Sequence, residues 1–364
     1  MDVTWVEIDL GALRHNISQI RKRIGRKVKI CAVVKDNAYG HGLLPVSQVA
    51  VEEGVDYLGV ADISDGIRLR TNKVNVPILN LVPNLPGDIK HAVKYDIIQC
   101  LSNSSLLRLL NEESRRQNKI SKVHIEVDTG MGRAGLFPES FKAFYDGISN
   151  LRNVKLDGIF THLACSDGDR EYTLRQIKLF KKVIMPVPSG PIIHCANSSG
   201  VISYPESHFD MVRPGLMIYG LTYTKKEQDK INLKPVLSWK TRVVLIREIK
   251  RRTPISYGAT YRTAGDTRIA VLAIGYGDGY NRMLSNRGKV IIGGKKYDVC
   301  GRVCMDMTMV DIGNEASVKV GDEVILIGKS NNQQIRVEDI AKICRTVPNE
   351  IVCAINKDLK REFN

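Results

Sequence analysis

The 364-residue sequence contains no apolar run long enough to cross a membrane, which argues against a helical membrane protein and against a membrane partner. Its first residues, 1–4, also lack the basic and apolar regions of a secretory signal peptide. Aromatic residues are scarce, at 6%, whereas 43% of the residues are hydrophobic and 26% are charged. This balance is typical of an ordinary globular protein with a full core, and we expect it to be cytoplasmic.

A compact cysteine framework and a cluster of metal ligands are also missing. The eight cysteines are dispersed, and several lie in apolar, strand-like contexts: Cys31, Cys100, Cys195 and Cys300. This distribution favours reduced thiols over a disulfide scaffold. His162 and His194 each stand alone on a predicted strand, without a second histidine at ligand spacing, so we expect no metal site.

The formal net charge of +15 raises the question of a nucleic-acid partner. The basic clusters at residues 21–23, 225–226 and 250–252 are short, far apart and not interleaved with aromatic residues. A nucleic-acid interface normally gathers its basic residues on one face. We therefore interpret the charge as a solvated surface and expect no nucleic-acid binding.

Short β-branched runs alternate with segments of helical periodicity through the first two thirds of the chain. Eight such runs can be counted: Val28–Val34, Tyr57–Ala61, Val76–Val82, Asp96–Leu101, Val123–Val127, Val154–Thr161, Pro191–Cys195 and Phe209–Val212. Parallel strands need crossover helices, and eight of them close into a barrel, whereas a doubly wound sheet usually has fewer strands. The pattern predicts a (β/α)8 TIM barrel over residues 9–230.

A second domain is predicted over residues 231–364. The segment from Leu221 to about Pro235 is polar and resembles a linker. Beyond it, strands are separated by turns rather than helices, at Arg242–Ile249, Arg268–Ile274, Val290–Ile292, Met307–Ile312 and Glu323–Ile327. This pattern predicts a mainly antiparallel β-domain, interrupted by one helix near Val337–Cys344. Residues 1–8 are expected to form a strand that joins it.

Polar residues follow five of the eight predicted barrel strands, where a TIM barrel carries its active site. They are Lys35, Arg133, His162, the pair Asn197 and Ser198, and Arg213. A partly desolvated lysine can form a Schiff base with an aldehyde cofactor. Loops after the seventh and eighth strands commonly hold a phosphate in this fold. The combination indicates pyridoxal 5'-phosphate.

Two motifs among these strand ends have alternative interpretations. Residues 130–135 satisfy G-x-G-x-x-G, but they follow the fifth strand and contain Arg133, so a tight turn that presents this arginine fits better than a dinucleotide site. Ser198 could be a helix N-cap as well as a phosphate ligand.

The run Val33–Gly42, with Lys35 near its start, resembles the pyridoxal phosphate attachment signature of the alanine racemase family, although Asp36 replaces a small residue. The resemblance extends over nearly the whole chain. It includes Asp128–Arg133, Thr161–His162, Ala196–Ser198, Arg213–Gly215, Ser256–Tyr261, Gly275–Tyr280 and Cys304–Asp306. The family's fold, a barrel followed by a β-domain, agrees with the architecture predicted above.

The resemblance implies racemisation of L-alanine to D-alanine, which supplies D-alanine for peptidoglycan. Lys35 would hold the cofactor and act as a base on one face of the substrate's Cα atom, and Tyr257 of the partner subunit would act on the other face. His162, linked to Arg213, would assist this tyrosine. The active unit would be a homodimer with composite active sites and a small amino-acid substrate.

The same resemblance assigns the remaining site residues. Arg213 would face the pyridine nitrogen, and because arginine does not readily lose a proton, the ring nitrogen would stay unprotonated. The phosphate contacts would be Tyr39, Ser198, Gly215, Leu216 and Tyr276. Arg133 and the backbone of Met305 would bind the substrate carboxylate.

Two departures from the family pattern raise questions about function. Many members carry a lysine that becomes carbamylated seven residues before the arginine that corresponds to Arg133. This chain has Glu126, whose carboxylate supplies the same charge, so we expect no carbamate. Near the C-terminus, Lys357 replaces a tyrosine that normally lies beside the catalytic one. This change leaves open a racemase of serine or of broader specificity.

Two other classes fit less of the sequence. A decarboxylase on the same barrel would carry a glycine-triplet phosphate loop and a cysteine-centred C-terminal site, and we find neither. A pyridoxal phosphate carrier without turnover would have no need for a β-domain that bears Tyr257.

Overall fold

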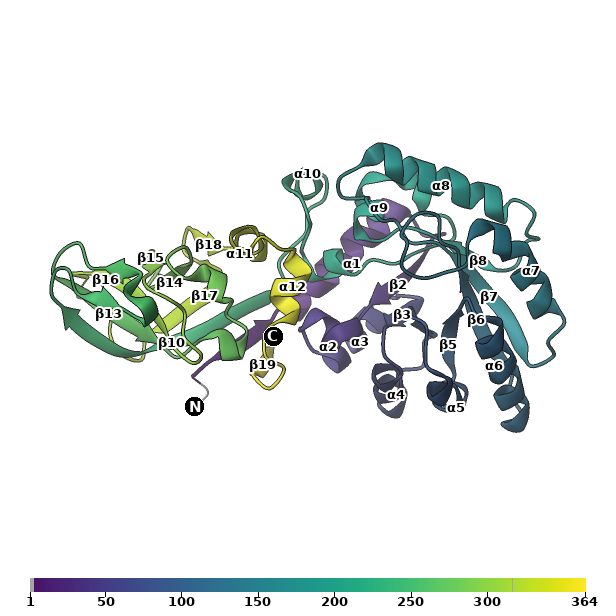
Figure 1. Cartoon of the computed structure of the whole chain (residues 1–364), viewed down its shortest axis with the longest axis horizontal. Helices are drawn as coiled ribbons and strands as arrows, with labels where there is room; N and C mark the ends of the chain where they lie inside the picture. The colour runs from purple at the N-terminus through teal and green to yellow at the C-terminus, as the bar shows by residue number, and fades with distance from the viewer. Residues whose placement is uncertain (1–2, 316) are drawn as a thin grey trace.

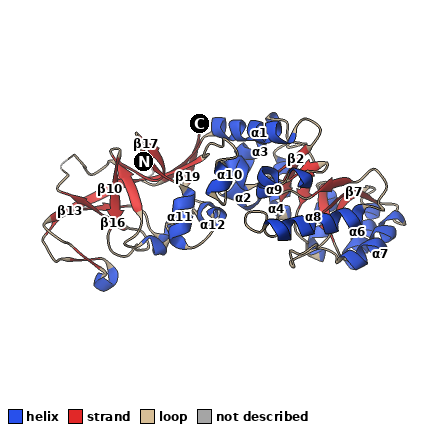
Figure 2. Ribbon diagram, turned by 90° about the horizontal axis from the view of Figure 1, so that it is seen from above, coloured by secondary structure: helices blue, strands red, loops and turns tan. Residues whose placement is uncertain are grey.

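The computed structural model describes residues 3–315 and 317–364. A barrel ringed by helices lies beside a part built mainly from strands (Figure 1). Seen from above, most helices gather around the barrel, whereas strands dominate the other part (Figure 2). Within the described residues, no helix is both long and apolar enough to cross a membrane.

The barrel is closed and has eight parallel strands in sequence order, which confirms the predicted fold class. The strands are β2 (Lys29–Val33), β3 (Tyr57–Val60), β4 (Ile78–Asn80), β5 (Ile97–Leu101), β6 (Ser121–Glu126), β7 (Val154–Phe160), β8 (Ile192–His194) and β9 (Met211–Val212). The pairing of Lys29 with Met211 closes the ring. The strands are mostly apolar along their whole length because side chains fill the interior and helices cover the outside.

Helices pack around the outside of the barrel. They are α2 (Lys35–Tyr39), α3 (Leu43–Glu52), α4 (Ile63–Thr71), α5 (Ile89–Lys94), α6 (Ser104–Arg116), α7 (Pro138–Ser149), α8 (Arg170–Ile184) and α9 (Ser198–Ser203). The last strand, β9, leads only into a 3-10 turn, η3 (Leu216–Tyr219). Helix α1 (Leu10–Ile24), which precedes the first barrel strand, packs against α3 and α9. It therefore fills the place that a helix after β9 would take.

The second part is built on a nine-stranded sheet. Its strands, in spatial order, are β18 (Gln333–Ile335), β17 (Glu323–Ser330), β14 (Lys289–Ile292), β15 (Lys295–Val299), β16 (Thr308–Gly313), β13 (Thr267–Leu272), β10 (Leu237–Ile249), β1 (Trp5–Ile8) and β19 (Lys360–Phe363). Strand β1 pairs antiparallel with β10 and parallel with β19, so the two ends of the chain meet in this sheet.

The smaller elements of this part include several that the sequence did not predict. They are β11 (Pro254–Ile255), β12 (Tyr261–Arg262), α11 (Val337–Cys344), α12 (Pro348–Cys353) and the 3-10 turns η4 (Tyr257–Ala259), η5 (Tyr276–Asp278) and η6 (Arg282–Leu284). Helix α11 matches the prediction, whereas α12 and strands β15, β18 and β19 were missed. Strand β15 was missed because its polar sequence, KKYDV, gives almost no apolar alternation.

The segment predicted to be a linker is packed into the structure. It contains a short helix, α10 (Lys225–Gln228), capped by Thr224. The Glu227 carboxylate accepts hydrogen bonds from the backbone N–H groups of Tyr223 and Thr224, at 3.0 and 3.3 Å. Its side chain is buried, as is that of Leu221. The polar composition did not reveal this packing, because Glu227 bonds to the local backbone while Lys225, Lys226 and Lys230 remain exposed.

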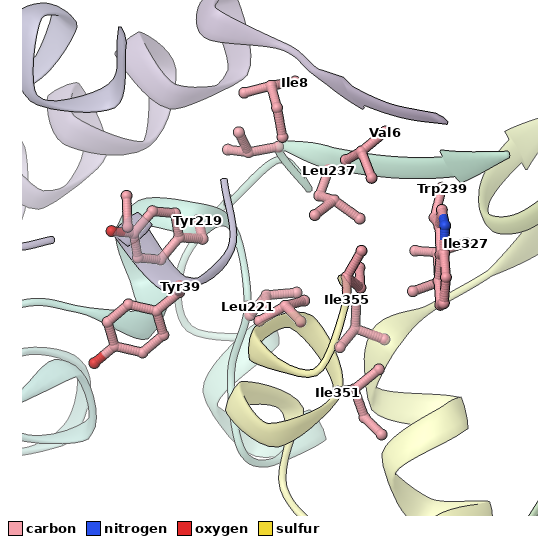
Figure 3. Packing of buried hydrophobic residues seen from close by; sticks show 14 of the residues in the cluster. Val6, Ile8, Tyr39, Tyr219, Leu221, Leu237, Trp239, Ile327, Ile351 and Ile355 are labelled. Carbon is pink, nitrogen blue, oxygen red and sulfur yellow. The ribbon is translucent and has the colours of Figure 1, made fainter. Parts of the chain in front are cut away.

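One apolar core continues from the barrel into the sheet. Figure 3 shows Ile8 and Val6 of β1 lying beside Leu237, with Ile351 and Ile355 on the opposite side. Helix α12 packs against α2, which follows the first barrel strand. A Cβ atom on Gly40 would lie 2.4 Å from the carbonyl oxygen of Val352. The C-terminal part thus supports the turn that carries Lys35 and Tyr39.

Candidate active site

A cavity of about 470 Å³ lies at the C-terminal ends of the barrel strands. Every site residue predicted within the barrel lines it: Lys35, Tyr39, Arg133, His162, Ser198, Arg213, Gly215 and Leu216. The strand-end argument predicted that Lys35, Arg133, His162, Ser198 and Arg213 would converge, whereas Tyr39, Gly215 and Leu216 were predicted from the family resemblance.

The turn after Lys35 has an unusual backbone. Residues 36–39 all have φ between 53° and 55°, the left-handed region that L-residues seldom occupy. Asp36 and Asn37 are residue types that tolerate this region, so Asp36 fits the turn. The Asn37 side chain accepts a hydrogen bond from Leu43 N at 2.9 Å, which holds the turn closed. The left-handed turn brings Lys35 and Tyr39 into the same cavity.

Tyr39, Ser198 and Gly215 form a small polar cup in the cavity wall. The Ser198 hydroxyl accepts hydrogen bonds from the N–H groups of Gly215 and Met217, at 3.1 and 3.2 Å. Asn197, not Ser198, caps helix α9, so the N-cap alternative for Ser198 is wrong. A Cβ atom on Gly215 would lie 2.6 Å from the Tyr39 hydroxyl, so glycine makes room for that group. Burial raises the pKa of Tyr39 and keeps it a neutral donor.

Arg213 is only 4% exposed and lies in the cavity wall. One guanidinium nitrogen, Nη1, donates to His194 Nδ1 at 2.7 Å, and the other, Nη2, donates to the Thr161 carbonyl at 2.9 Å and to His162 Nδ1 at 3.4 Å. Burial, and after it the nearby positive charge of Arg213, lowers the pKa of His162 to about 3. His162 is therefore neutral at physiological pH.

A glycine-rich loop presents Arg133 to the cavity. One oxygen of the Asp128 carboxylate accepts hydrogen bonds from the N–H groups of Gly130 and Met131, at 2.9 and 2.8 Å. Gly130 and Gly132 have φ of 134° and 66°. The motif is therefore a tight turn around a carboxylate, as the sequence indicated.

Glu126 lines the cavity but does not hold Arg133. In the part of the chain that the structure describes, no ion pair joins these two residues, and the contact of the Glu126 carboxylate is with the Cys100 thiol, at 3.8 Å. Burial raises the pKa of Glu126, and the charges of Arg213 and Arg133 oppose this shift. Glu126 therefore places a carboxyl group in the cavity wall, as the sequence suggested, without a direct ion pair to Arg133.

Three predicted site residues lie outside the cavity of their own chain. Tyr257, Tyr276 and Met305 are on turns of the C-terminal part and are 72%, 44% and 55% exposed. Their turns are tied together, because Tyr276 N donates to the Cys304 carbonyl at 3.0 Å and the Ser256 hydroxyl donates to the Arg302 carbonyl at 2.6 Å. We call these three residues, with the exposed Met283 and Met307, the C-terminal exposed cluster.

Lys357 also lies outside the cavity. It lines a neighbouring hollow together with Asp36, Asp62 and Asp65. It is therefore not among the residues of the same chain that line the cavity beside Lys35.

Sequence reasoning missed several residues. Tyr223 and Asn349 line the cavity and bond to each other, with Asn349 Nδ2 donating to the tyrosine hydroxyl at 3.1 Å. His124, Asp157 and His194 lie beneath Arg213 in the barrel interior. Polar residues inside apolar strands were the available signal, but they could be linked only once the strands were arranged in space.

Comparisons with known proteins agree with this fold and this site. The family model described as "Alanine racemase, N-terminal domain" matches residues 8–223, and "Alanine racemase, C-terminal domain" matches residues 236–363. The alanine racemase of Halothermothrix orenii is 43% identical, and the match covers 99% of this chain and 96% of that protein. The alanine racemase of Symbiobacterium thermophilum is 40% identical, over 100% and 97% of the two chains.

Comparison with solved structures also identifies alanine racemases as similar proteins. The alanine racemase of Clostridium difficile 630 superposes with a TM-score of 0.93 at 34% identity, over 100% of this chain and 96% of that one. The Bacillus anthracis alanine racemase with bound L-Ala-P has a TM-score of 0.93 at 32% identity, over 100% and 95%. The fold and site thus define an enzyme of the isomerase class. The chain belongs to the alanine racemase family.

Proposed function

We propose that this protein interconverts L-alanine and D-alanine as a homodimer that uses pyridoxal 5'-phosphate. The observation that carries the proposal is the convergence of Lys35, Tyr39, Ser198, Arg213 and Gly215 on one cavity at the barrel mouth. A cytoplasmic location is part of the proposal. Its support is that all eight cysteines are free, as in a reducing compartment.

The residues around the cavity fit this cofactor. Among the described residues, the Tyr39 hydroxyl has no hydrogen-bond partner, and it lies where a Cβ on Gly215 would clash. Ser198 and the backbone N–H groups beside it supply further polar contacts of the kind that phosphate takes. Lys35 lines the same cavity and would provide the covalent attachment.

When bound, pyridoxal phosphate supplies an electron-withdrawing ring that stabilises negative charge at the substrate Cα atom. Arg213 would face the ring nitrogen and, as a donor that does not release its proton, leave that nitrogen unprotonated. Arg133 would bind the substrate carboxylate, since its guanidinium has no ion-pair partner among the described residues. Lys35 would remove or return a proton on one face of Cα.

Inversion at Cα needs a second base on the opposite face, and the C-terminal exposed cluster is suited to provide it. Its side chains are exposed, and hydrogen bonds tie the turns of Tyr257, Tyr276 and Met305 to one another; exposed apolar side chains held close together favour an interface with another molecule. Because Tyr257 lies outside the cavity of its own chain, Tyr257 of the partner subunit would supply the second base. Met305 of the partner subunit would approach the substrate carboxylate in the same way, and Tyr276 is carried by the same surface.

The proposal is tested first by incubating the purified, cofactor-loaded protein with L-alanine, L-serine, L-lysine and L-arginine and measuring the D-enantiomers by chiral chromatography. We expect alanine to be racemised fastest, since Lys357, the departure that suggested another substrate, lies outside the cavity. A faster rate with serine or a basic amino acid would reassign the substrate. Release of carbon dioxide without a D-amino acid would contradict the reaction class.

The composite site is tested by pairing two inactive subunits. A dimer that contains one Lys35→Ala chain and one Tyr257→Ala chain should have one complete site and one site lacking both bases. Purification through two different tags should therefore yield about half of the wild-type activity per dimer. Equal inactivity of the mixed dimer and the two parent variants would mean that the bases are not shared.

The reciprocal dimer is the matched control. It pairs a wild-type chain with a chain that carries both substitutions, so each shared site lacks one base and the dimer should be inactive. If each chain instead used its own Tyr257, this control would retain about half of the activity and the first dimer none. The two arrangements thus give opposite results.

A further inference from the structure

A chain of polar side chains crosses the interior of the barrel, where TIM barrels usually pack branched aliphatic residues. It starts at Arg213 in the cavity wall, whose guanidinium contacts His194 Nδ1 at 2.7 Å. His194 Nε2 lies 2.8 Å from His124 Nδ1, and His124 Nε2 lies 3.4 Å from the carboxylate of Asp157. Both histidines are completely buried.

Hydrogen-bond chemistry fixes every proton in this chain. Arginine can only donate, so His194 Nδ1 must accept and the histidine must carry its proton on Nε2. That proton is donated to His124 Nδ1, which places the His124 proton on Nε2, facing Asp157. Both histidines are therefore neutral and in the Nε2–H form, and the chain runs from a cation at the cavity to a carboxylate at the far end.

The backbone around Asp157 is adapted to this contact. Val123 of β6 pairs with Leu156 of β7, but the next residue, His124, pairs with Gly158, so Asp157 is the extra residue of a β-bulge. Bulges redirect a side chain and are common beside active sites. A Cβ atom on Gly158 would lie 2.5 Å from the His124 ring, so only glycine leaves room for that ring.

The far end of the chain is firmly held. The Tyr57 hydroxyl donates to Asp157 Oδ2 at 3.0 Å, and Lys122 lies 3.1 Å from Oδ1. At the other end, the Phe160 ring contacts both His194 and Arg213. It stacks on the His194 ring, with 4.8 Å between the ring centroids, and the Arg213 guanidinium carbon lies 4.8 Å from the Phe160 centroid. No carboxylate forms an ion pair with Arg213 among residues 3–315 and 317–364. The chain through two histidines thus connects this buried cation to an ionised carboxylate.

We propose that Asp157 is a positioning residue that acts through His124 and His194 to hold Arg213 in one orientation, as a charged donor in the cavity wall. Asp157 does not contact the cavity. It accepts the last hydrogen bond, from His124 Nε2–H, so that the tautomers required by Arg213 are held from both ends. The accepting Nδ1 of His194 in turn keeps Arg213 Nη1 pointing into the barrel and the guanidinium plane fixed. The catalytic consequence rests on the proposed function, whereas the tautomers can be measured without it.

The first measurement is the ¹⁵N NMR spectrum of the full-length protein with labelled histidine, with or without cofactor. We expect both His124 and His194 to carry their proton on Nε2, with assignments taken from His124→Gln and His194→Gln variants. Asp157→Leu leaves the buried His124 Nε2–H without an acceptor, so the hydrogen-bonded order should loosen and a second His124 tautomer should appear. Asp157→Asn, which retains an acceptor oxygen, should preserve the single tautomer. A proton on Nδ1 of either histidine in the wild-type protein would overturn the proposal.

The second measurement is racemisation by the cofactor-loaded variants. We expect Asp157→Leu to lower kcat by roughly 10- to 100-fold, the range for residues that orient a site from behind it, with a nearly unchanged KM. Asp157→Asn should recover most of this loss. Lys122→Met, which removes a different contact of the same carboxylate, is the matched control and should retain both tautomers. If Asp157→Leu folds and both its tautomers and its kcat are unchanged, the proposal is refuted. If this variant does not fold, the decision rests on the tautomers of the wild-type protein and on the tautomers and kcat of Asp157→Asn.

Discussion

Replacing Lys35 by alanine is expected to abolish racemisation of alanine in both directions. The substitution removes both the proposed point of covalent attachment and one of the two bases. A positioned base alone contributes about 10²- to 10⁴-fold to a rate, so the activity should fall at least that far. The left-handed turn after residue 35 does not depend on the lysine side chain, because it is closed by backbone groups and by Asn37. The variant should therefore fold.

The attachment is measured independently of the activity. Borohydride reduction of the cofactor-loaded protein should add the cofactor's mass to the peptide that contains Lys35, and the Lys35→Ala variant should lack this adduct. Lys142→Ala, which changes a lysine exposed on α7, is the control and should behave as wild type. A cofactor adduct on another lysine of the wild-type protein would contradict the assignment.

Replacing Tyr257 by phenylalanine is expected to separate the two faces of the reaction. Racemisation must fall equally in both directions because the equilibrium between enantiomers is fixed. The difference between the two faces therefore has to be measured separately for each enantiomer, as exchange of its Cα hydrogen in D₂O. Loss of the hydroxyl should slow this exchange for one enantiomer by about 10²- to 10⁴-fold. Exchange from the other enantiomer, through Lys35, should change only slightly.

The ratio of the two exchange rates decides the assignment of Tyr257. Equal losses for both enantiomers would show that this tyrosine does not serve one face. Tyr145→Phe, at a ring packed on Phe141 of α7, is a matched control for loss of a phenol and should leave both rates unchanged. Because Tyr257 is 72% exposed in a single chain, its substitution should cost little stability.

The barrel could be predicted from sequence because its strands are buried on both faces. Each predicted run from Val28–Val34 to Phe209–Val212 overlaps a barrel strand, since a short continuous apolar run between helical segments is typical of a parallel strand covered on both sides. The C-terminal sheet was predicted less completely. Strands β15 and β19 have mixed polar sequences, and β19 is recognisable only through its pairing with β1, at the opposite end of the chain.

The candidate site was also predicted only in part from sequence. Lys35 and Arg213 follow barrel strands, so strand order alone predicts that they converge. By contrast, Lys357 and Glu126 were recognised only as departures from the family pattern, and the structure places Lys357 in a neighbouring hollow and Glu126 beside Cys100. Such contacts depend on side-chain packing within a few ångströms, which a one-dimensional pattern does not contain.

The sequence by itself determined the fold class and the family and led to the prediction of Lys35 as the attachment lysine, because these follow from periodicity and from residues adjacent along the chain. Only the tertiary structure decided which polar groups meet inside the barrel. Asp157, His124 and His194 lie on different strands and are linked by a bulge and by a glycine without a side chain. Their hydrogen bonds exist because β6, β7 and β8 pair side by side in a register that brings these three side chains together inside the barrel, and that register is a property of the folded chain.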